Sequence, residues 1–244
     1  MNVHRTPWNQ TPPLQSQKML IELSHHLSED VPFYSTLAKP KLKQLYALEK
    51  GDVCNSYFFT TSNHAGTHVD APRHFCAAGR AITEYELSEL VFTKPAVLDV
   101  PLHDEELIEP RRLEQAVVAA PPDTDVILLR SHFGRFRGDE RRYVDRSPGF
   151  GPAAAAFLLD HFSGLRAIAV DFMSISSPSH ADAGAEAHRV FLGCGGHKSG
   201  PVLLIEDAKI PDTLPLLRRV FVIPWMFEGL DSAPCTMFAE AANA

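Results

Sequence analysis

A dense cluster of potential metal ligands lies in one short segment of this 244-residue chain. Three histidines and one aspartate occur within eleven positions: His64, His68, Asp70 and His74. Imidazole nitrogen and carboxylate oxygen are ligands that zinc, manganese and iron(II) accept, and catalytic sites for such ions keep positions open for water or substrate. The segment therefore predicts a divalent metal site, and the fold has to hold these side chains close together.

The backbone of this cluster is expected to be irregular rather than helical. Gly66 and Thr67 are poor helix formers, and Pro72 follows closely. Ala65 stands where the zinc-protease signature H-E-x-x-H needs a glutamate as general base. Residues 53–61, directly before the cluster, are rich in aromatic and β-branched side chains, which is typical of a strand. We therefore expect the ligands at the end of that strand and in the turn after it.

The remainder of the chain alternates between strand-like and helix-like segments. Short apolar runs predict strands at residues 20–23, 96–100, 126–130, 167–170, 202–205 and 220–223. Residues 110–120 and 152–161 predict helices, each beginning with a proline, which suits the first helical position. This alternation indicates an α/β or mixed α+β domain built on one main sheet.

Composition narrows the class of protein further. A hydrophobic fraction of 45% and a charged fraction of 22% are those of an ordinary globular protein, and 244 residues fit one large domain. The net charge of −7 offers no basic face for nucleic acid, and no segment has the apolar length of a membrane span or a signal peptide. We expect an N-terminal arm at residues 1–19, a catalytic domain at residues 20–244, and a cytoplasmic location.

The four cysteines are widely spaced and form no C-x-x-C pair. This argues against a zinc ribbon or a thioredoxin-like motif, and it suits a reducing compartment. Cys76 lies two positions after His74, where we expect it to be a small buried residue rather than a soft metal ligand.

The segment from His64 to Phe75 resembles the H-x-G-T-H-x-D-x-P-x-H motif of the metal-dependent cyclase family, which includes bacterial kynurenine formamidases and isatin hydrolases. Residues 21–25 resemble the opening strand of that family, and residues 223–224 and 229–234 resemble its closing segment. The resemblance implies a mixed α/β fold: a swivelling β/β/α-type single domain with a β-barrel-like core flanked by helices. It also implies a homodimer or homotetramer.

The resemblance further implies roles for individual residues. His64, His68 and Asp70 match the metal ligands of the family, and His74 matches a catalytic acid or base. A second-metal pair is matched by His188, in a segment that resembles A-H-x-x-L-L-G, and by Glu206, at the end of a predicted strand.

Two further segments bear on the pocket. Residues 194–200, which include His197, are an insertion relative to the usual spacing, so they either leave the second metal pair in place or remodel it. Phe33 and Tyr34 stand where relatives have aromatic pocket residues, so we expect them to bind substrate.

These residues predict a metal-dependent hydrolase that holds one or two divalent ions, zinc or manganese. A metal-bound hydroxide would attack a small amide, lactam or lactone, such as an aryl formamide or an isatin-like ring. His74 would carry the proton, since the ordinary pKa of histidine, about 6.5, lies near working pH. Two alternatives stay open: a cyclase or dehydratase that uses the same site, and a metal-binding protein without activity. The expected partner is a small molecule, with no nucleic acid or membrane.

Overall fold

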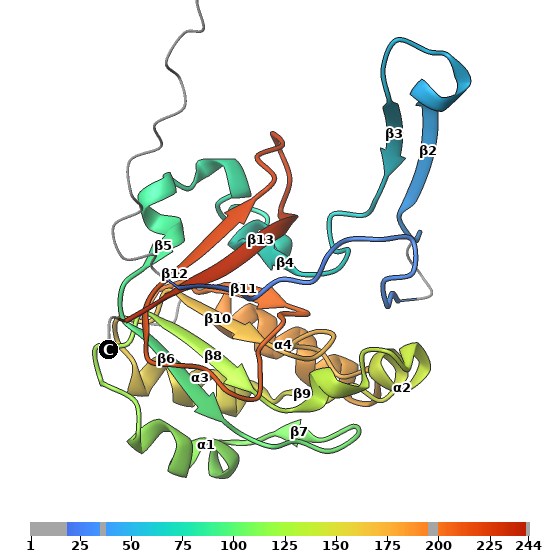
Figure 1. The fold of residues 1–244 in the computed structure, drawn as a ribbon. Coiled ribbons are helices and arrows are strands. Elements are labelled where there is room, and N and C mark those ends of the chain that lie inside the picture. The colour runs from blue at the N-terminus through green and yellow to red at the C-terminus, as the bar shows by residue number, and fades with distance from the viewer. Residues whose placement is uncertain (1–18, 35–37, 195–199, 243–244) are drawn as a thin grey trace, which may run out of the picture.

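The computed structural model describes residues 19–34, 38–194 and 200–242. Its centre is one strongly curved sheet of nine strands, with helices packed on one side (Figure 1). The order across the sheet is β5-β12-β13-β4-β11-β10-β8-β6, and β1 also pairs with β13. The strands are β1 (Leu20–Glu22), β4 (His68–Asp70), β5 (Val91–Phe92), β6 (Pro95–Asp99), β8 (Val126–Arg130), β10 (Ala167–Val170), β11 (Leu203–Glu206), β12 (Leu217–Pro224) and β13 (Ser232–Ala241).

The sheet has a parallel half and an antiparallel half. β6, β8, β10 and β11 run parallel, whereas β4 pairs antiparallel with both β11 and β13. β12 also approaches β6 at the far side, so the sheet curves until it is nearly closed. The expected mixed α/β single domain with a β-barrel-like core is confirmed.

The central parallel strands β8 and β10 are apolar almost throughout because both of their faces are buried, whereas the edge strand β6 alternates between buried and more exposed residues. On β8, Ile127 and Leu129 pack against the helical layer, while Val126 and Leu128 face the interior of the curved sheet. This alternation follows from the two-residue repeat of a strand. The helical layer consists of α1 (Pro110–Val118), α2 (Glu140–Asp145), α3 (Pro152–His161) and α4 (Ala181–Phe191).

The predicted helices at residues 110–120 and 152–161 are α1 and α3, and each has its proline at the start, where a missing N–H costs nothing. We made no helix prediction for α2 or α4. Six short 3-10 helices complete the helical structure of the described residues: Leu48–Lys50, Pro72–His74, Ile82–Glu84, Leu87–Leu90, Phe133–Phe136 and Pro178–His180. β7 (Leu107–Ile108) and β9 (Gly149–Phe150) form a separate two-stranded parallel pair, in which β9 contacts α4.

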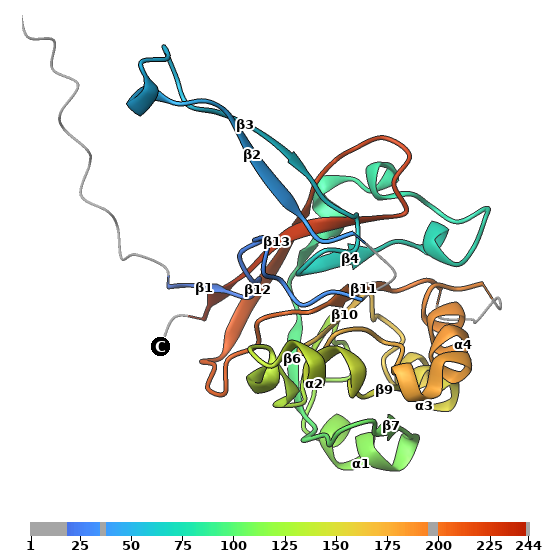
Figure 2. The same cartoon turned by 90° about the vertical axis from the view of Figure 1, so that its right-hand side faces the viewer.

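A long hairpin projects from the body of the molecule. It is formed by β2 (Lys41–Tyr46) and β3 (Ser56–Thr60) and stands clear of the main sheet in both views (Figures 1 and 2). β3 confirms a strand within residues 53–61. The predicted position of the ligands is wrong in one respect: His68 and Asp70 lie on a separate strand, β4, which turn and bend residues 63–67 separate from the hairpin.

The cysteines also differ from the expectation that Cys76 is simply a small buried residue. Cys76 and Cys194 form a disulfide, with their Cα atoms 5.3 Å apart. The two residues are 118 positions apart, so no short-range sequence pattern marks the pair. The other cysteines, Cys54 and Cys235, are unpaired. Across the described residues, no helix combines the length and the apolar character needed to cross a membrane.

Candidate metal centre

The centre is built on β4, which lies in the middle of the sheet between β11 and β13. Antiparallel register places His68 directly opposite Glu206 of β11, and places Asp70 opposite Ser232 of β13. Gly66 precedes the strand with a φ of +63°, a conformation that other residues rarely adopt. Its carbonyl oxygen accepts a hydrogen bond from His68 Nδ1 at 2.8 Å. The turn therefore leaves His68 Nε2 as the nitrogen that faces the two carboxylates.

One group of possible ligands consists of His68, Asp70 and Glu206, all buried. His68 Nε2 lies 3.6 Å from Asp70 Oδ1 and 3.3 Å from Glu206 Oε2. Burial by itself lowers the pKa of His68, yet the Asp70 and Glu206 carboxylates outweigh burial and raise that pKa to about 9. The environment of Nε2 therefore favours a positive charge.

A second group shares Asp70 and adds His64 and His74. His64 Nδ1 lies 3.3 Å from Asp70 Oδ1. The rings of His64 and His74 are 4.4 Å apart, centroid to centroid, and both side chains are partly exposed. The geometry therefore makes His74 a possible ligand as well as the acid or base that the sequence predicted.

Asp231 is a functional residue that the sequence analysis missed. Its Oδ2 accepts a hydrogen bond from His74 Nδ1 at 2.8 Å, and its Oδ1 accepts one from Asn63 Nδ2 at 2.9 Å. Burial lowers the pKa of His74, but Asp231 and the more distant carboxylates outweigh burial and raise it. The closing segment of the family resemblance includes this position, but 157 residues separate it from His74 and no local signal joins the two.

The structure brings together Glu206 and His188, the pair matched to a second metal site. His188 Nε2 lies 3.2 Å from Glu206 Oε1, and the Glu206 carboxylate also accepts hydrogen bonds from Ser174 Oγ and from the backbone N–H of Ile175. His188 Nδ1 bonds to the carbonyl oxygen of Gly184, one turn earlier on α4. The inserted segment does not separate Glu206 from His188, although its residues 195–199, including His197, lie outside the described residues.

These side chains open onto one cavity of about 330 Å³, which is within the size range of small-molecule sites. Its other walls are largely apolar, from Phe75 and Met173. Tyr34 lines the cavity as predicted, and its hydroxyl donates to the carbonyl oxygen of Ser176 at 3.4 Å. Phe33 does not line the cavity. Its side chain is buried in a small hydrophobic cluster with Val31 and Ala65.

The residues fit a divalent cation. His68 Nε2 and both carboxylate oxygens of Asp70 are buried and have no hydrogen-bond partner. Burying polar and charged atoms without hydrogen bonds is costly, and His64 and His68 are the cationic groups nearest to Asp70, so a divalent cation between these atoms would stabilise them. Nitrogen and oxygen donors of this kind suit zinc, manganese or iron(II).

Comparison with known proteins identifies the family. The family model described as "Putative cyclase" matches residues 21–177, which include the β4 ligands and His74. The chain belongs to the cyclase family. A curated member, "Cyclase-like protein 2" of Oryza sativa subsp. japonica, is 26% identical over 233 residues, which cover 89% of this chain and 77% of that protein.

Solved structures share the cyclase-family fold. Isatin hydrolase A from Labrenzia aggregata, bound to benzyl benzoate, superposes with a TM-score of 0.76 at 19% identity, covering 92% of this chain and 94% of that one. A "predicted metal-dependent hydrolase from Bacillus stearothermophilus" superposes with a TM-score of 0.69 at 20% identity, covering 92% and 98%. At this level of identity, the comparison establishes the fold alone.

Proposed function

We propose that this cyclase-family chain is a metal-dependent hydrolase that opens a small amide, lactam or lactone, of the aryl formamide or isatin type. One observation carries the proposal: buried donor atoms of His68 and Asp70 that make no hydrogen bond lie beside a small cavity, next to the His74–Asp231 pair. Two solved structures of this fold, an isatin hydrolase and a predicted metal-dependent hydrolase, support the reaction class.

Zinc or manganese would be held at one or two positions that share Asp70. His68, Asp70 and Glu206 would hold one ion, with His188 beside Glu206, and His64 and Asp70 would hold the other, with His74 as a further ligand if it does not act as the acid or base. A divalent ion there supplies Lewis acidity: it lowers the pKa of a bound water and polarises a carbonyl group.

The protein's own residues would supply the proton transfer and the substrate pocket. With Nδ1 of His74 bonded to Asp231, Nε2 is the nitrogen available to take a proton from water and deliver it to the leaving nitrogen or oxygen. Tyr34 and Phe75 present aromatic surfaces in the cavity, which suits a flat ring beside the scissile bond.

The test combines metal analysis with product analysis. Protein purified without chelator should contain one to two ions of zinc or manganese per chain and should hydrolyse members of a panel of aryl formamides, isatins and lactones. In water labelled with ¹⁸O, hydrolysis incorporates the label into the acid product, whereas dehydration or ring closure does not. An absence of metal binding, even after incubation with zinc or manganese, would contradict the proposal.

His74→Ala separates the two roles that the geometry allows for this residue. As an acid or base, its loss should lower kcat by about 10²- to 10⁴-fold with metal content unchanged. As a ligand, its loss should lower the metal content. His132→Ala is the matched control, because His132 also bonds to carboxylates but does not line the cavity.

We also propose that the chain acts as a homo-oligomer, in which the β2–β3 hairpin packs against a second copy. Both faces of this hairpin are exposed, and an isolated two-stranded hairpin is marginally stable in water. Its exposed side chains include Leu45, Tyr57 and Phe58, each at least 50% accessible. Sedimentation should show a dimer or tetramer, and Leu45→Ser with Phe58→Ser should shift it toward monomer; a monomeric wild type would refute the assembly.

A further inference from the structure

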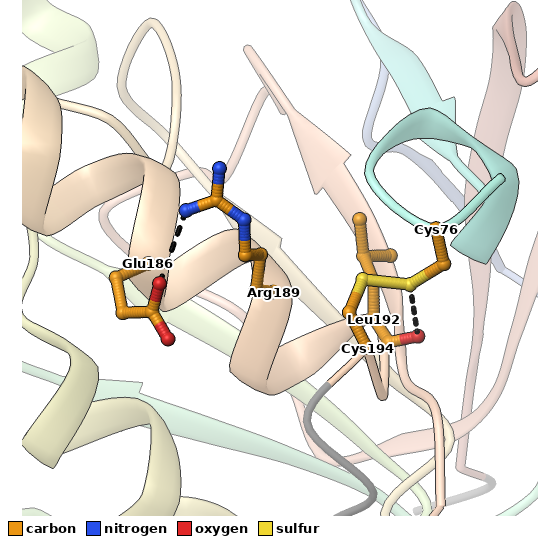
Figure 3. Close-up of a disulfide and its surroundings, with 5 residues drawn as sticks. All are labelled: Cys76, Glu186, Arg189, Leu192 and Cys194. Carbon is orange, nitrogen blue, oxygen red and sulfur yellow. Dashed lines mark hydrogen bonds and ion pairs between the residues drawn. A yellow bond between two sulfur atoms is a disulfide. The ribbon is translucent and has the colours of Figure 1, made fainter.

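Two segments that form one wall of the cavity are tied together by the disulfide (Figure 3). Cys76 comes two residues after His74, at the end of a short 3-10 helix, and Cys194 comes shortly after α4, which carries His188. His74, His188 and the intervening Phe75 all line the cavity. The covalent bond therefore joins the chain segment that bears the proposed acid or base to the helix that bears a proposed ligand.

Weaker contacts cross between the same two segments. The ring of Phe75 stacks on the ring of His188, with centroids 4.6 Å apart and planes inclined by 18°. The guanidinium of Arg189 lies 5.7 Å from the centroid of Phe75, and Glu186 holds it through an ion pair of 3.0 Å (Figure 3). These contacts are individually small, so the disulfide is the strongest link that sets the distance between Phe75 and α4.

The pair is open to attack from one side. Cys194 is exposed and Cys76 is partly buried, so a thiol in solution reaches Cys194 first. The Cys76 sulfur lies 3.5 Å from the carbonyl oxygen of Leu192. A disulfide sulfur has no hydrogen to donate, whereas the thiol that reduction creates finds an acceptor for its S–H at that oxygen.

We propose that Cys76 and Cys194 form a thiol–disulfide switch that sets the shape of the cavity wall. A dithiol reductant attacks Cys194 through one thiolate, forming a mixed disulfide while Cys76 leaves as a thiolate and takes up a proton. The second thiol of the reductant then displaces Cys194, so two electrons and two protons pass to the protein and the reductant becomes a disulfide. A disulfide oxidant closes the bond by the reverse exchange.

The consequence of the switch is local. In the disulfide state, Phe75 is held against His188 and the wall is rigid; in the dithiol state, only non-covalent contacts remain: the ring and ion contacts and the hydrogen bond from the Cys76 thiol to the Leu192 carbonyl oxygen. Disulfides in the cytoplasm, where we predict this chain, are transient and regulatory rather than permanent staples. The effect on turnover rests on the proposed function, but the bond and the motion of the wall do not.

Thiol counting tests the bond itself. After mild oxidation with a disulfide oxidant, alkylation of the unfolded protein should label only Cys54 and Cys235, and peptide mapping should recover Cys76 linked to Cys194. After treatment with a dithiol such as dithiothreitol under native conditions, all four cysteines should be labelled on unfolding. Four free thiols in the oxidised sample would overturn the proposal.

Hydrogen exchange tests the wall, independently of activity. Reduction should raise amide exchange in peptides covering residues 72–78 and 186–194, and should leave the buried strand at residues 126–130 unchanged. The paired variant Cys76→Ser with Cys194→Ser should show the raised exchange and no response to the reductant. Cys54 is exposed and lies outside the pair, so the control variant Cys54→Ser should show the same rise in exchange on reduction as the wild type.

Turnover supplies the third readout. Reduction should lower kcat/KM by about tenfold or more, because displacement of groups around a reacting centre by about 1 Å can cost two orders of magnitude. Re-oxidation should restore it. A bond that forms without any change in exchange at residues 72–78 and 186–194 would overturn the switch, whatever substrate the enzyme uses. Changed exchange with no turnover in either state would instead refute the proposed function and leave the switch standing.

Discussion

Replacing Asp231 with asparagine should disable His74 without removing it. In the native site, Asp231 accepts hydrogen bonds from both sides: from His74 Nδ1 through Oδ2 and from Asn63 Nδ2 through Oδ1. The asparagine has only one amide oxygen, and Asn63 continues to offer it a donor. The new NH₂ group then points at His74, whose Nδ1 has to become the acceptor, so the proton of the neutral ring moves to Nε2.

That tautomer cannot take a proton at the nitrogen proposed to face the substrate. General acid–base catalysis by a positioned side chain typically contributes about 10² to 10⁴ in rate. We therefore expect Asp231→Asn to lower kcat by that factor, equivalent to about 2.7–5.4 kcal/mol of transition-state stabilisation. KM and the metal content should stay close to those of the wild type, because Asp231 makes no hydrogen bond to a proposed ligand other than His74; its Oδ2 lies 3.9 Å from His64 Nε2.

The assay is steady-state turnover of whichever panel substrate the wild type hydrolyses, with metal content measured on the same samples. Asp212→Asn is the matched control, since Asp212 bonds to His132 Nδ1 at 3.0 Å on an exposed surface. An Asp231→Asn variant with wild-type kcat and a full metal complement would refute the role of His74 as the proton carrier. A variant that loses metal would instead assign the pair to ligation.

Three further outcomes are expected. Burial lowers the pKa of His25 to about 4, so as the pH falls below 6.5 this histidine takes up a proton in the unfolded chain before it does so in the folded protein. The free energy of unfolding should therefore fall by up to about 3 kcal/mol between pH 6.5 and 4. In His25→Gln, urea unfolding should lack that part of the pH dependence, and a profile identical to that of the wild type would exclude the effect. Gly184→Ala would place a Cβ 2.5 Å from the Ser176 Cα, so α4 has to shift; thermal unfolding should show a loss of about 1–3 kcal/mol, and a wild-type melting temperature would contradict the close approach. Removing metal with a chelator should lower the melting temperature by roughly 5–10 °C, and adding zinc or manganese back should restore it, whereas a chelator-insensitive melt would argue against a tightly held ion.

Much of the fold could be predicted because its signals are local. The apolar runs of β8 and β10 have no polar face, and such a pattern is typical of a strand that is buried on both sides. α1 and α3 each begin at a proline, which is favoured at the first position of a helix and disfavoured in its interior. The short hairpin strand β2 was missed, because its six residues are exposed and carry no alternating apolar pattern.

The candidate site, too, could be predicted only in part from the sequence. The spacing from His64 to His74, with Gly66 and Thr67 as poor helix formers, predicts from the sequence by itself that these side chains lie close together. Their grouping around Asp70 required the structure, because it depends on β4 lying between β11 and β13. Pairing between strands is set by hydrogen bonds and packing across the whole sheet, which residue periodicity does not encode.

The sequence by itself determined the chemistry available to this protein: imidazoles and a carboxylate, closely spaced on backbone that does not form an α-helix. Only the tertiary structure decided how that chemistry is arranged. It brought Asp231 to His74 across 157 residues, Glu206 to His68 through the register of β4 and β11, and Cys194 to Cys76 across 118 residues. Each of these contacts joins segments far apart in the chain, and their proximity results from the burial of the shared sheet rather than from any property of the residues that meet.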